Sequence, residues 1–248
     1  TIFSKGSIAK YSLLFFCFLA AANWFFEILK WQTLVSAFEK INFKTALKQS
    51  LASLTVSLAT PNRIGEYGAK ALFFENRKRK KILMLNFISG MAQMFVTSFF
   101  GFFGLLYLLP NFNIYYSVTM ICYFGIGVIL LFAIGYYFKE KELLLKGFSI
   151  VKVIQFFKKI PFQIKFKTVL FSAFRYAIFS GMFYGILVFF GGKIAFSEAI
   201  PLIFAMYFLV SIFPTLFIFD VVIRGSVAVW LFSFAGVPEL IVLSTVLA

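Results

Sequence analysis

The sequence predicts an all-α protein, a polytopic helical bundle within a membrane. Hydrophobic residues make up 62% of its 248 residues and charged residues only 13%, whereas soluble domains have roughly 45–50% and 25%. Residues 82–109 and 111–138 contain no charged side chain, and about 20 helical residues cross a bilayer core. We expect residues 1–248 to form a single integral membrane domain. The chain has no initiator Met and stops within an apolar run, so we expect it to be part of a longer protein.

The first predicted element is one long helix. An apolar run begins at Tyr11 and continues past Glu27 and Lys30 toward Phe38. A group of lysines follows at every fourth residue, a spacing that places side chains on one helical face. We expect this face to meet the anionic headgroups of the inner leaflet. Its members are Lys40, Lys44 and Lys48.

A short segment rich in Ser and Thr, residues 49–60, comes next. At 1.5 Å per residue it covers only about 18 Å, too little to cross a bilayer. Pro61 interrupts the backbone, and the chain is basic again from Arg77. Because both flanks carry cytoplasmic charge, residues 44–76 are predicted to form a re-entrant helical hairpin with its tip near Pro61. Broken backbone at membrane depth needs protein or water around it.

Two full membrane helices are predicted next, residues 82–109 outward and 111–138 inward. Residues 149–159 then carry an apolar stripe on one helical face and a polar stripe on the opposite face, the pattern of a helix that lies in the interface plane. Residues 168–192 form the next crossing, and Arg175 is its internal charge.

The last part of the chain repeats the outline of the first. A short apolar segment leads to Pro214, and an acid–arginine pair, Asp220 and Arg224, follows it. Proline-broken segments in both halves of a membrane protein are typical of an inverted repeat with a site at the midplane. The sequence therefore predicts two re-entrant, proline-broken hairpins in an inverted repeat, with halves of approximately 11–138 and 139–248.

The net charge of +15 comes from short connections between apolar runs. By the positive-inside rule, residues 40–48, 77–81 and 139–167 lie in the cytoplasm. The uncharged turn at 110–113 and the turn carrying Lys193 then lie outside. This pattern indicates a multi-pass protein of the cytoplasmic membrane rather than one that binds nucleic acid.

Groups for conventional catalysis are missing from the sequence. It has no histidine, and its cysteines, Cys17 and Cys122, show no metal-binding spacing. It also lacks a nucleophile elbow and a phosphate-binding loop motif. We expect no enzyme activity, no metal and no cofactor; an intramembrane lipid transferase with an acidic base is the weakest alternative.

The candidate site residues lie in two charge clusters, each behind a proline. One contains Arg63 and Glu66, the other Asp220 and Arg224. A charge in hydrocarbon costs at least ~2.5 kcal/mol, so such residues face protein or a wet cavity. An arginine grips phosphate with two parallel hydrogen bonds, and a helix end freed by a proline also favours anions.

An alternative is that both clusters are structural. Their members are three and four residues apart, so each pair could close locally on one helix face. Arg175 either serves the same cavity or pairs with Glu198 or Asp220. Hinge or structural roles are expected for Pro61, Gly65, Pro214 and Gly225.

Residues 59–68, ATPNRIGEYG, contain a P-x-R-x-G-E motif behind the Ser/Thr-rich segment. This motif resembles the membrane domain of the lysylphosphatidylglycerol synthase/flippase family. Pro214 and residues 222–225, VIRG, are similar to a later P…G-V-R-E segment of that family, with Gly225 in place of the glutamate. The family's soluble lipid-synthesising domain has no counterpart in this chain.

The resemblance implies a flippase-like transporter that moves a phosphate-bearing lipid, aminoacylated or glycosylated, between leaflets. Arg63 and Arg224 would hold the phosphate, and Glu66 and Asp220 would orient them or meet an amine. The expected partners are membrane lipids, a lipid-synthesising enzyme and a second copy of the chain. The alternative is an accessory or regulatory membrane subunit with structural ion pairs.

Overall fold

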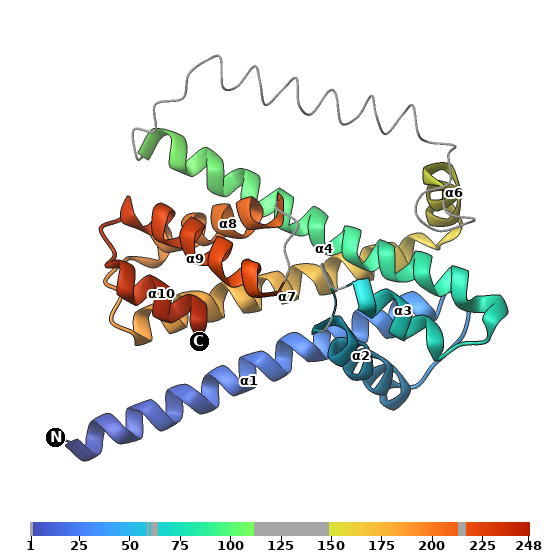
Figure 1. Ribbon diagram of the computed structural model, residues 1–248, viewed down its shortest axis with the longest axis horizontal. Coiled ribbons are helices and arrows are strands. Elements are labelled where there is room, and N and C mark those ends of the chain that lie inside the picture. The colour runs from blue at the N-terminus through green and yellow to red at the C-terminus, as the bar shows by residue number, and fades with distance from the viewer. Residues whose placement is uncertain (1, 59, 61–63, 112–148, 213–216) are drawn as a thin grey trace.

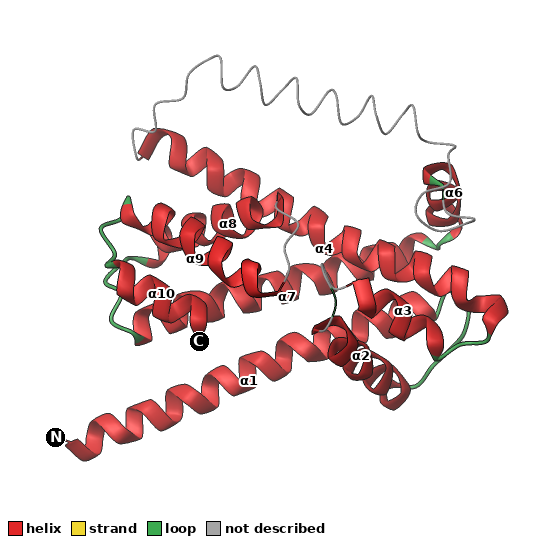
Figure 2. Ribbon diagram, viewed as in Figure 1, coloured by secondary structure: helices red, strands yellow, loops and turns green. Residues whose placement is uncertain are grey.

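The computed structural model describes residues 2–58, 60, 64–111, 149–212 and 217–248. Within these ranges all regular structure is helical, and there is no strand (Figure 2). The helices are α1 (Ile2–Val35), α2 (Phe43–Leu58), α3 (Ile64–Leu72), α4 (Asn76–Asn111), α6 (Ile150–Lys159), α7 (Phe162–Phe189), α8 (Phe196–Ile212), α9 (Phe217–Ser233) and α10 (Glu239–Leu247). The predicted all-α class is therefore confirmed. Pro61, Arg63, Cys122, Pro214 and most of the predicted helix 111–138 lie outside the described residues.

Three helices are long and apolar enough to cross a membrane. They are α1 over Tyr11–Val35, α4 over Asn76–Leu108 and α7 over Phe162–Phe189. This confirms the membrane character of the chain. The prediction was wrong in one detail near the first crossing: Lys40 precedes α2 and lies in the connection, so only Lys44 and Lys48 share a helix.

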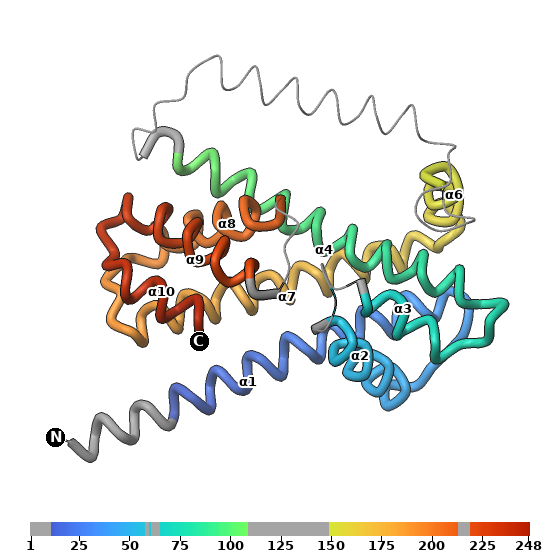
Figure 3. Tube along the Cα trace, in the orientation of Figure 1, coloured from blue at the N-terminus to red at the C-terminus, as the bar shows by residue number. Residues whose placement is uncertain are grey.

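The short helices gather at opposite ends of the long ones (Figure 1). The Cα trace shows that α1 ends, α4 begins and α7 begins at the end where α2, α3 and α6 lie (Figure 3). We call this the basic end, because the connections rich in Lys and Arg meet there. Lys78 contacts Glu39 at 2.8 Å, and the rings of Phe38 and Phe156 stack. The opposite end, formed by α8, α9 and α10, is the far end.

Two hydrophobic cores lie at these two ends. The core of the basic end contains the fully buried Trp31 and Leu85, and that of the far end contains Leu187 and Phe232. Along α4, residues of the first core end at Ile88, and residues of the second begin beyond residue 100. The stretch of α4 between the cores carries polar side chains, and the site lies there.

Helices α4 and α8 cross with their backbones in contact. A Cβ atom at Gly104 would lie 2.5 Å from the carbonyl oxygen of Pro201, and one at Gly101 would overlap the Phe208 side chain. Close approach of this kind is what small residues allow in membrane helices. By contrast, of the two glycines Gly181 and Gly185 on α7, only Gly185 meets a neighbour, the ring of Phe16.

Helices α2 and α3 pack against each other as a hairpin, as do α8 and α9 (Figure 1). The backbone N–H of Gly65 donates to Thr60 Oγ1 at 2.8 Å. A Cβ atom at Gly65 would lie 2.8 Å from the Val56 carbonyl oxygen, so the glycine of the P-x-R-x-G-E motif lets α3 approach α2. In the second hairpin, Gly225 of α9 faces Leu243 of α10 with little space to spare.

Candidate functional site

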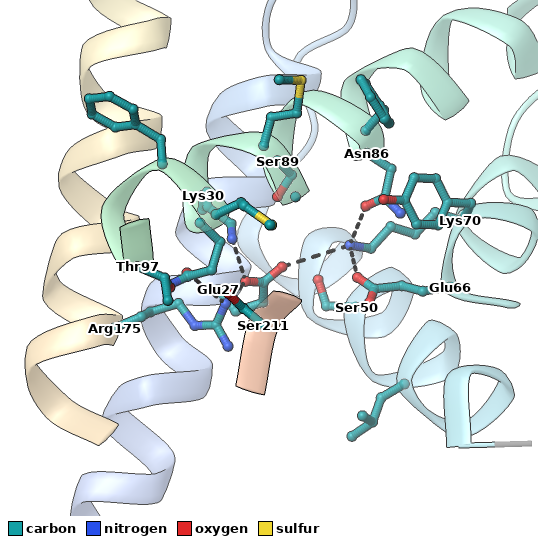
Figure 4. Close-up of a pocket in the computed structure, with 18 of the residues that line it drawn as sticks. Glu27, Lys30, Ser50, Glu66, Lys70, Asn86, Ser89, Thr97, Arg175 and Ser211 are labelled. Atoms are coloured by element: carbon teal, nitrogen blue, oxygen red, sulfur yellow. Dashed lines mark hydrogen bonds and ion pairs between the residues drawn. The ribbon is translucent and has the colours of Figure 1, made fainter. Parts of the chain in front are cut away.

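A cavity of about 910 Å³ lies between the two cores (Figure 4). Helices α1, α2, α3, α4 and α7 form its walls, and Ser211 reaches it from the end of α8. Five charged side chains line it: Glu27, Lys30, Glu66, Lys70 and Arg175. Hydroxyl and amide groups line much of the rest: Ser50, Asn86, Ser89, Gln93, Thr97 and Ser98.

Glu27 is the centre of the charged network. Its Oε2 atom accepts hydrogen bonds from Lys30 Nζ at 2.8 Å and from Arg175 Nη1. Its Oε1 atom lies 3.8 Å from Lys70 Nζ. The Glu27 side chain is only 9% exposed. Since a buried charge needs partners, Glu27 ties three cations from α1, α3 and α7 to one point.

The Lys70 ammonium interacts with residues of α1, α3 and α4. It donates to Glu66 Oε1 at 2.7 Å and to Asn86 Oδ1 at 3.1 Å, and it lies 4.4 Å from the centre of the Trp31 ring. Trp31 in turn donates from Nε1 to Gln49 Oε1 at 2.8 Å. An ammonium over a Trp face gains a favourable cation–π interaction. Lys70 therefore joins α3 to α1 and α4.

Arg175 lies at the middle of the membrane helices. It occupies the midpoint of the span Phe162–Phe189, and Asn23, which accepts a hydrogen bond from Arg175 Nε at 3.1 Å, occupies the midpoint of Tyr11–Val35. Gln93, which accepts from Arg175 Nη1 at 3.4 Å, lies next to the midpoint of the third span. The guanidinium is thus at the depth where hydrocarbon would otherwise surround it.

Two hydroxyl groups add to the polar wall. Burial and the neighbouring Glu66 carboxylate raise the pKa of the Tyr67 hydroxyl, which therefore stays neutral. Ser50 is 2% exposed, and its Oγ atom has no hydrogen-bond partner. A buried polar atom without a partner is uncommon and costly, so Ser50 is a group to which a ligand could bind.

The outer rim of the cavity is apolar. On α4, Asn86, Ser89 and Thr97 are buried, whereas a second set of lining residues on the same helix is exposed. The exposed set consists of Phe87, Met91, Met94 and Phe95, whose side chains are 39%, 56%, 50% and 61% exposed. One helix therefore supplies both a polar inner wall and an apolar rim.

An aromatic cluster lies next to the cavity on the far-end side. Tyr176 follows Arg175 directly, and its ring contacts Phe100 and Phe204 at centroid distances of 5.2 and 5.3 Å. It also contacts Phe179 and Tyr207. We call these five residues the aromatic cluster. They separate the cavity from the core of the far end.

Three buried hydroxyls follow one face of α7 through this region. Ser172, Tyr176 and Ser180 are four residues apart and at most 1% exposed. The Ser172 hydroxyl has no hydrogen-bond partner, and the hydroxyls of Tyr176 and Ser180 are close enough to interact with each other. The stripe begins beside the cavity and leads toward the far end.

The structure brings two of the predicted site residues, Glu66 and Arg175, to one cavity. The predicted partners of Arg175 were wrong: it pairs with Glu27, not with Glu198 or Asp220. Asp220 and Arg224 lie on α9 and do not line the cavity; Arg224 Nη2 donates to Asp220 Oδ2 at 2.8 Å. Arg63 lies outside the described residues.

The sequence analysis missed three of the most buried charges: Glu27, Lys30 and Lys70. Glu27 and Lys30 interrupt a long apolar run, which is itself a sign of a functional site. That sign was overlooked because the helix was expected to reach the interface there. Lys70 follows Glu66 by four residues, the spacing of a helical ion pair.

The described residues contain no group of three or more His, Cys, Asp or Glu side chains that could hold a metal ion. The cavity instead offers ammonium, guanidinium, hydroxyl and amide donors. This set is suited to an anion, and above all to phosphate oxygens.

Comparison with known proteins leaves the site to be interpreted from its geometry. No family model matches the sequence, and no curated protein and no solved structure is significantly similar to it.

Proposed function

We propose that the protein is a flippase-like transporter that moves a phosphate-bearing lipid between the leaflets of the cytoplasmic membrane. The headgroup enters the cavity, and the acyl chains stay in the bilayer. Passage through a polar cavity avoids most of the ~2.5 kcal/mol or more that a charge costs in hydrocarbon.

The shape and chemistry of the cavity support a lipid ligand. Its inner wall is charged, and its rim carries Phe87, Met91, Met94 and Phe95 in exposed positions. A polar pocket beside exposed apolar side chains suits a molecule with a headgroup and tails. Methionine also adapts to irregular apolar partners.

The position of the short helices supports alternating access. Helix α2 has 16 residues and α8 and α9 have 17 each, so each covers only about 24–26 Å. We propose that α2–α3 and α8–α9 are re-entrant hairpins that enter from opposite sides, as an inverted repeat requires. The cavity is then the half of the path next to the basic end, and the aromatic cluster is the barrier that must open.

The observation that carries this proposal is a charged cavity at the midpoint of three membrane-spanning helices. It is tested with purified protein in liposomes that contain a trace of fluorescent phospholipid, whose transfer between leaflets is followed by chemical quenching from outside. We expect Arg175→Gln to slow translocation by at least about tenfold. Glu27 keeps Lys30 and Lys70 as partners in this variant, so folding is expected to be retained.

Lys193→Gln is the matched control, because Lys193 is an exposed cation outside the cavity. It should translocate lipid like the wild type. Wild-type protein that translocates no faster than empty liposomes, or an Arg175→Gln variant that is folded and fully active, would contradict the proposal.

One observation favours a second candidate, an accessory membrane subunit with structural ion pairs. Asp220 and Arg224 close a local pair within α9, and Glu27 forms ion pairs with cations from three helices. In that case, lipid translocation would be absent, and loss of Arg175 would reduce only stability or association with a partner.

A further inference from the structure

The charges that line the cavity do not balance. Three cations, Lys30, Lys70 and Arg175, face two carboxylates, Glu27 and Glu66, so the described lining carries one excess positive charge. Burial of an uncompensated charge is strongly unfavourable. An anion in the cavity would remove this imbalance.

The excess charge can be assigned to one side of the cavity. Lys70 and Glu66 form a close pair at 2.7 Å, which is neutral as a unit. What remains is the Glu27 carboxylate, shared between Lys30 and Arg175 through a single oxygen, Oε2. The positive charge in excess therefore belongs to Lys30 and Arg175.

Lys30 and Arg175 both have N–H groups that could donate hydrogen bonds to a ligand. An ammonium carries three N–H donors, and the described contact of Lys30 is the one with Glu27 at 2.8 Å. The described contacts of Arg175, to Asn23, Glu27 and Gln93, use Nε and Nη1. Lys30 is 2% exposed and still lines the cavity, so an anion there would be enclosed.

We infer that the ligand is a lipid headgroup with a net charge of −1, and that its phosphodiester binds between Lys30 and Arg175. This inference rests on the proposed function and narrows its substrate. A zwitterionic headgroup would leave the excess charge uncompensated. A lysylated headgroup, with a net positive charge, would add to it, so the charge count argues against the aminoacylated lipid that the motif resemblance implies.

The uncharged part of the lining fits a headgroup that carries hydroxyls. Ser50 Oγ has no partner in the structure, and Ser89, Thr97 and Ser98 line the same cavity. Serine and threonine hydroxyls both donate and accept hydrogen bonds, as glycerol and sugar hydroxyls do. The expected ligand is therefore a monoanionic phospholipid with a polyol headgroup.

The test measures binding rather than transport. Detergent-solubilised full chain is titrated with dioctanoyl phosphatidylglycerol, dioctanoyl phosphatidylethanolamine, dioctanoyl lysylphosphatidylglycerol and free glycerol phosphate, and bound lipid is counted by native mass spectrometry. We expect phosphatidylglycerol to bind at least about tenfold more tightly than the other two lipids. Free glycerol phosphate should bind more weakly than phosphatidylglycerol, because it cannot use the apolar rim.

Two variants change the charge count in opposite directions. Lys30→Met makes the lining neutral, so the preference for phosphatidylglycerol over phosphatidylethanolamine should disappear. Glu66→Gln raises the excess to two charges, and the preference should persist or grow. The Glu66 side chain is 21% exposed and that of Glu27 is 9% exposed. We therefore expect Glu66→Gln to destabilise the fold less than a substitution of Glu27 would.

Equal binding of the three lipids by the wild type would overturn the inference, as would an unchanged preference in the Lys30→Met variant or a lost preference in the Glu66→Gln variant. Free glycerol phosphate binding as tightly as phosphatidylglycerol would overturn the assignment of a lipid and leave a site for a soluble anion. These outcomes are separate from failure of the proposed function, which the translocation assay detects whatever lipid is preferred.

Discussion

The ionic network around Glu27 and the Asp220–Arg224 pair differ in how their partners are brought together. Glu27 and Arg175 are 148 residues apart and pair only because α1 and α7 pack side by side. Asp220 and Arg224 are four residues apart on α9. The side chains of the first pair are 9% and 16% exposed and those of the second 34% and 37%. The Glu27–Arg175 pair therefore depends on the assembled bundle, whereas the Asp220–Arg224 pair is made within one helix.

This difference has consequences for stability and for function. The charged side chains of the buried network cannot reach bulk water unless the protein unfolds. The network also has one excess positive charge that a ligand could neutralise. A local, half-exposed pair neutralises itself. Removal of a charge from the cavity should therefore change stability strongly, and removal of a charge from the pair on α9 only weakly.

The largest effect is expected for Glu27→Gln. The change removes the shared partner of Lys30, Lys70 and Arg175, and loss of one partner of a buried ion pair typically costs 3–5 kcal/mol, so we expect a loss of about this size. The free energy of unfolding is measured by titration with sodium dodecyl sulfate in mixed micelles.

Glu39→Gln is the control for this variant. Glu39 pairs with Lys78 at the same 2.8 Å separation, but the two side chains are 43% and 46% exposed. An exposed pair is worth roughly 0–1 kcal/mol. If the two variants lose the same stability, the contrast between buried and exposed charge is mistaken.

The sequence predicted the helices better than the site. A charge-free run of membrane length located α4, and an apolar run with Arg175 as its one internal charge located the main part of α7, because hydropathy largely decides which segments can be buried in lipid. Arg175 and Glu66 were recognised as unusual charges in apolar surroundings. The Glu27–Arg175 pair could not be derived, because a single sequence does not show which face of α1 meets α7.

The second prediction concerns the far end, which close packing of helices holds together rather than charge. Gly104→Ala would place a methyl group against backbone atoms, 2.5 Å from the Pro201 oxygen and 2.7 Å from the Ala205 nitrogen. Overpacking of this kind costs about 1–3 kcal/mol. The same unfolding titration gives the value.

Gly181→Ala provides the comparison for Gly104→Ala. A Cβ atom at Gly181 meets nothing within 4 Å, and alanine is better than glycine in a helix by up to about 1 kcal/mol. We expect this variant to be neutral or stabilised. Since helix propensity favours alanine at both positions, destabilisation by both changes would mean that the loss at Gly104 is not specific to the α4–α8 crossing.

The third prediction uses the hydroxyl stripe of α7. Ser172 is fully buried and its Oγ atom has no hydrogen-bond partner, so Ser172→Ala should stabilise the closed state by about 1 kcal/mol. If the stripe lines the path when the aromatic cluster opens, lipid translocation should become slower in the same variant. Greater stability with unchanged translocation would place the stripe outside the path.

The smallest effect is expected for Asp220→Asn. If the pair with Arg224 faces water, as it would at the far end of a lipid path, its loss should cost only about 0.2–1 kcal/mol. If the half-exposed arginine instead faces hydrocarbon, removal of its partner should cost at least ~2.5 kcal/mol. The two environments therefore give clearly different values in the unfolding titration.

Arg224→Gln completes this test, because it removes the cation instead of the acid. In a wet environment both changes should be small and similar. In hydrocarbon, Asp220→Asn should be the more damaging, since it leaves an unpaired charge, whereas Arg224→Gln leaves a carboxylate that can be protonated. Helix α9, which carries the pair, packs against α8, which carries Tyr207 of the aromatic cluster. A wet pair would therefore bring water to the far side of the barrier. A small loss of unfolding free energy in both variants would support a lipid path that continues beyond the aromatic cluster. A large loss for Asp220→Asn would indicate that the lipid path does not extend beyond the cavity.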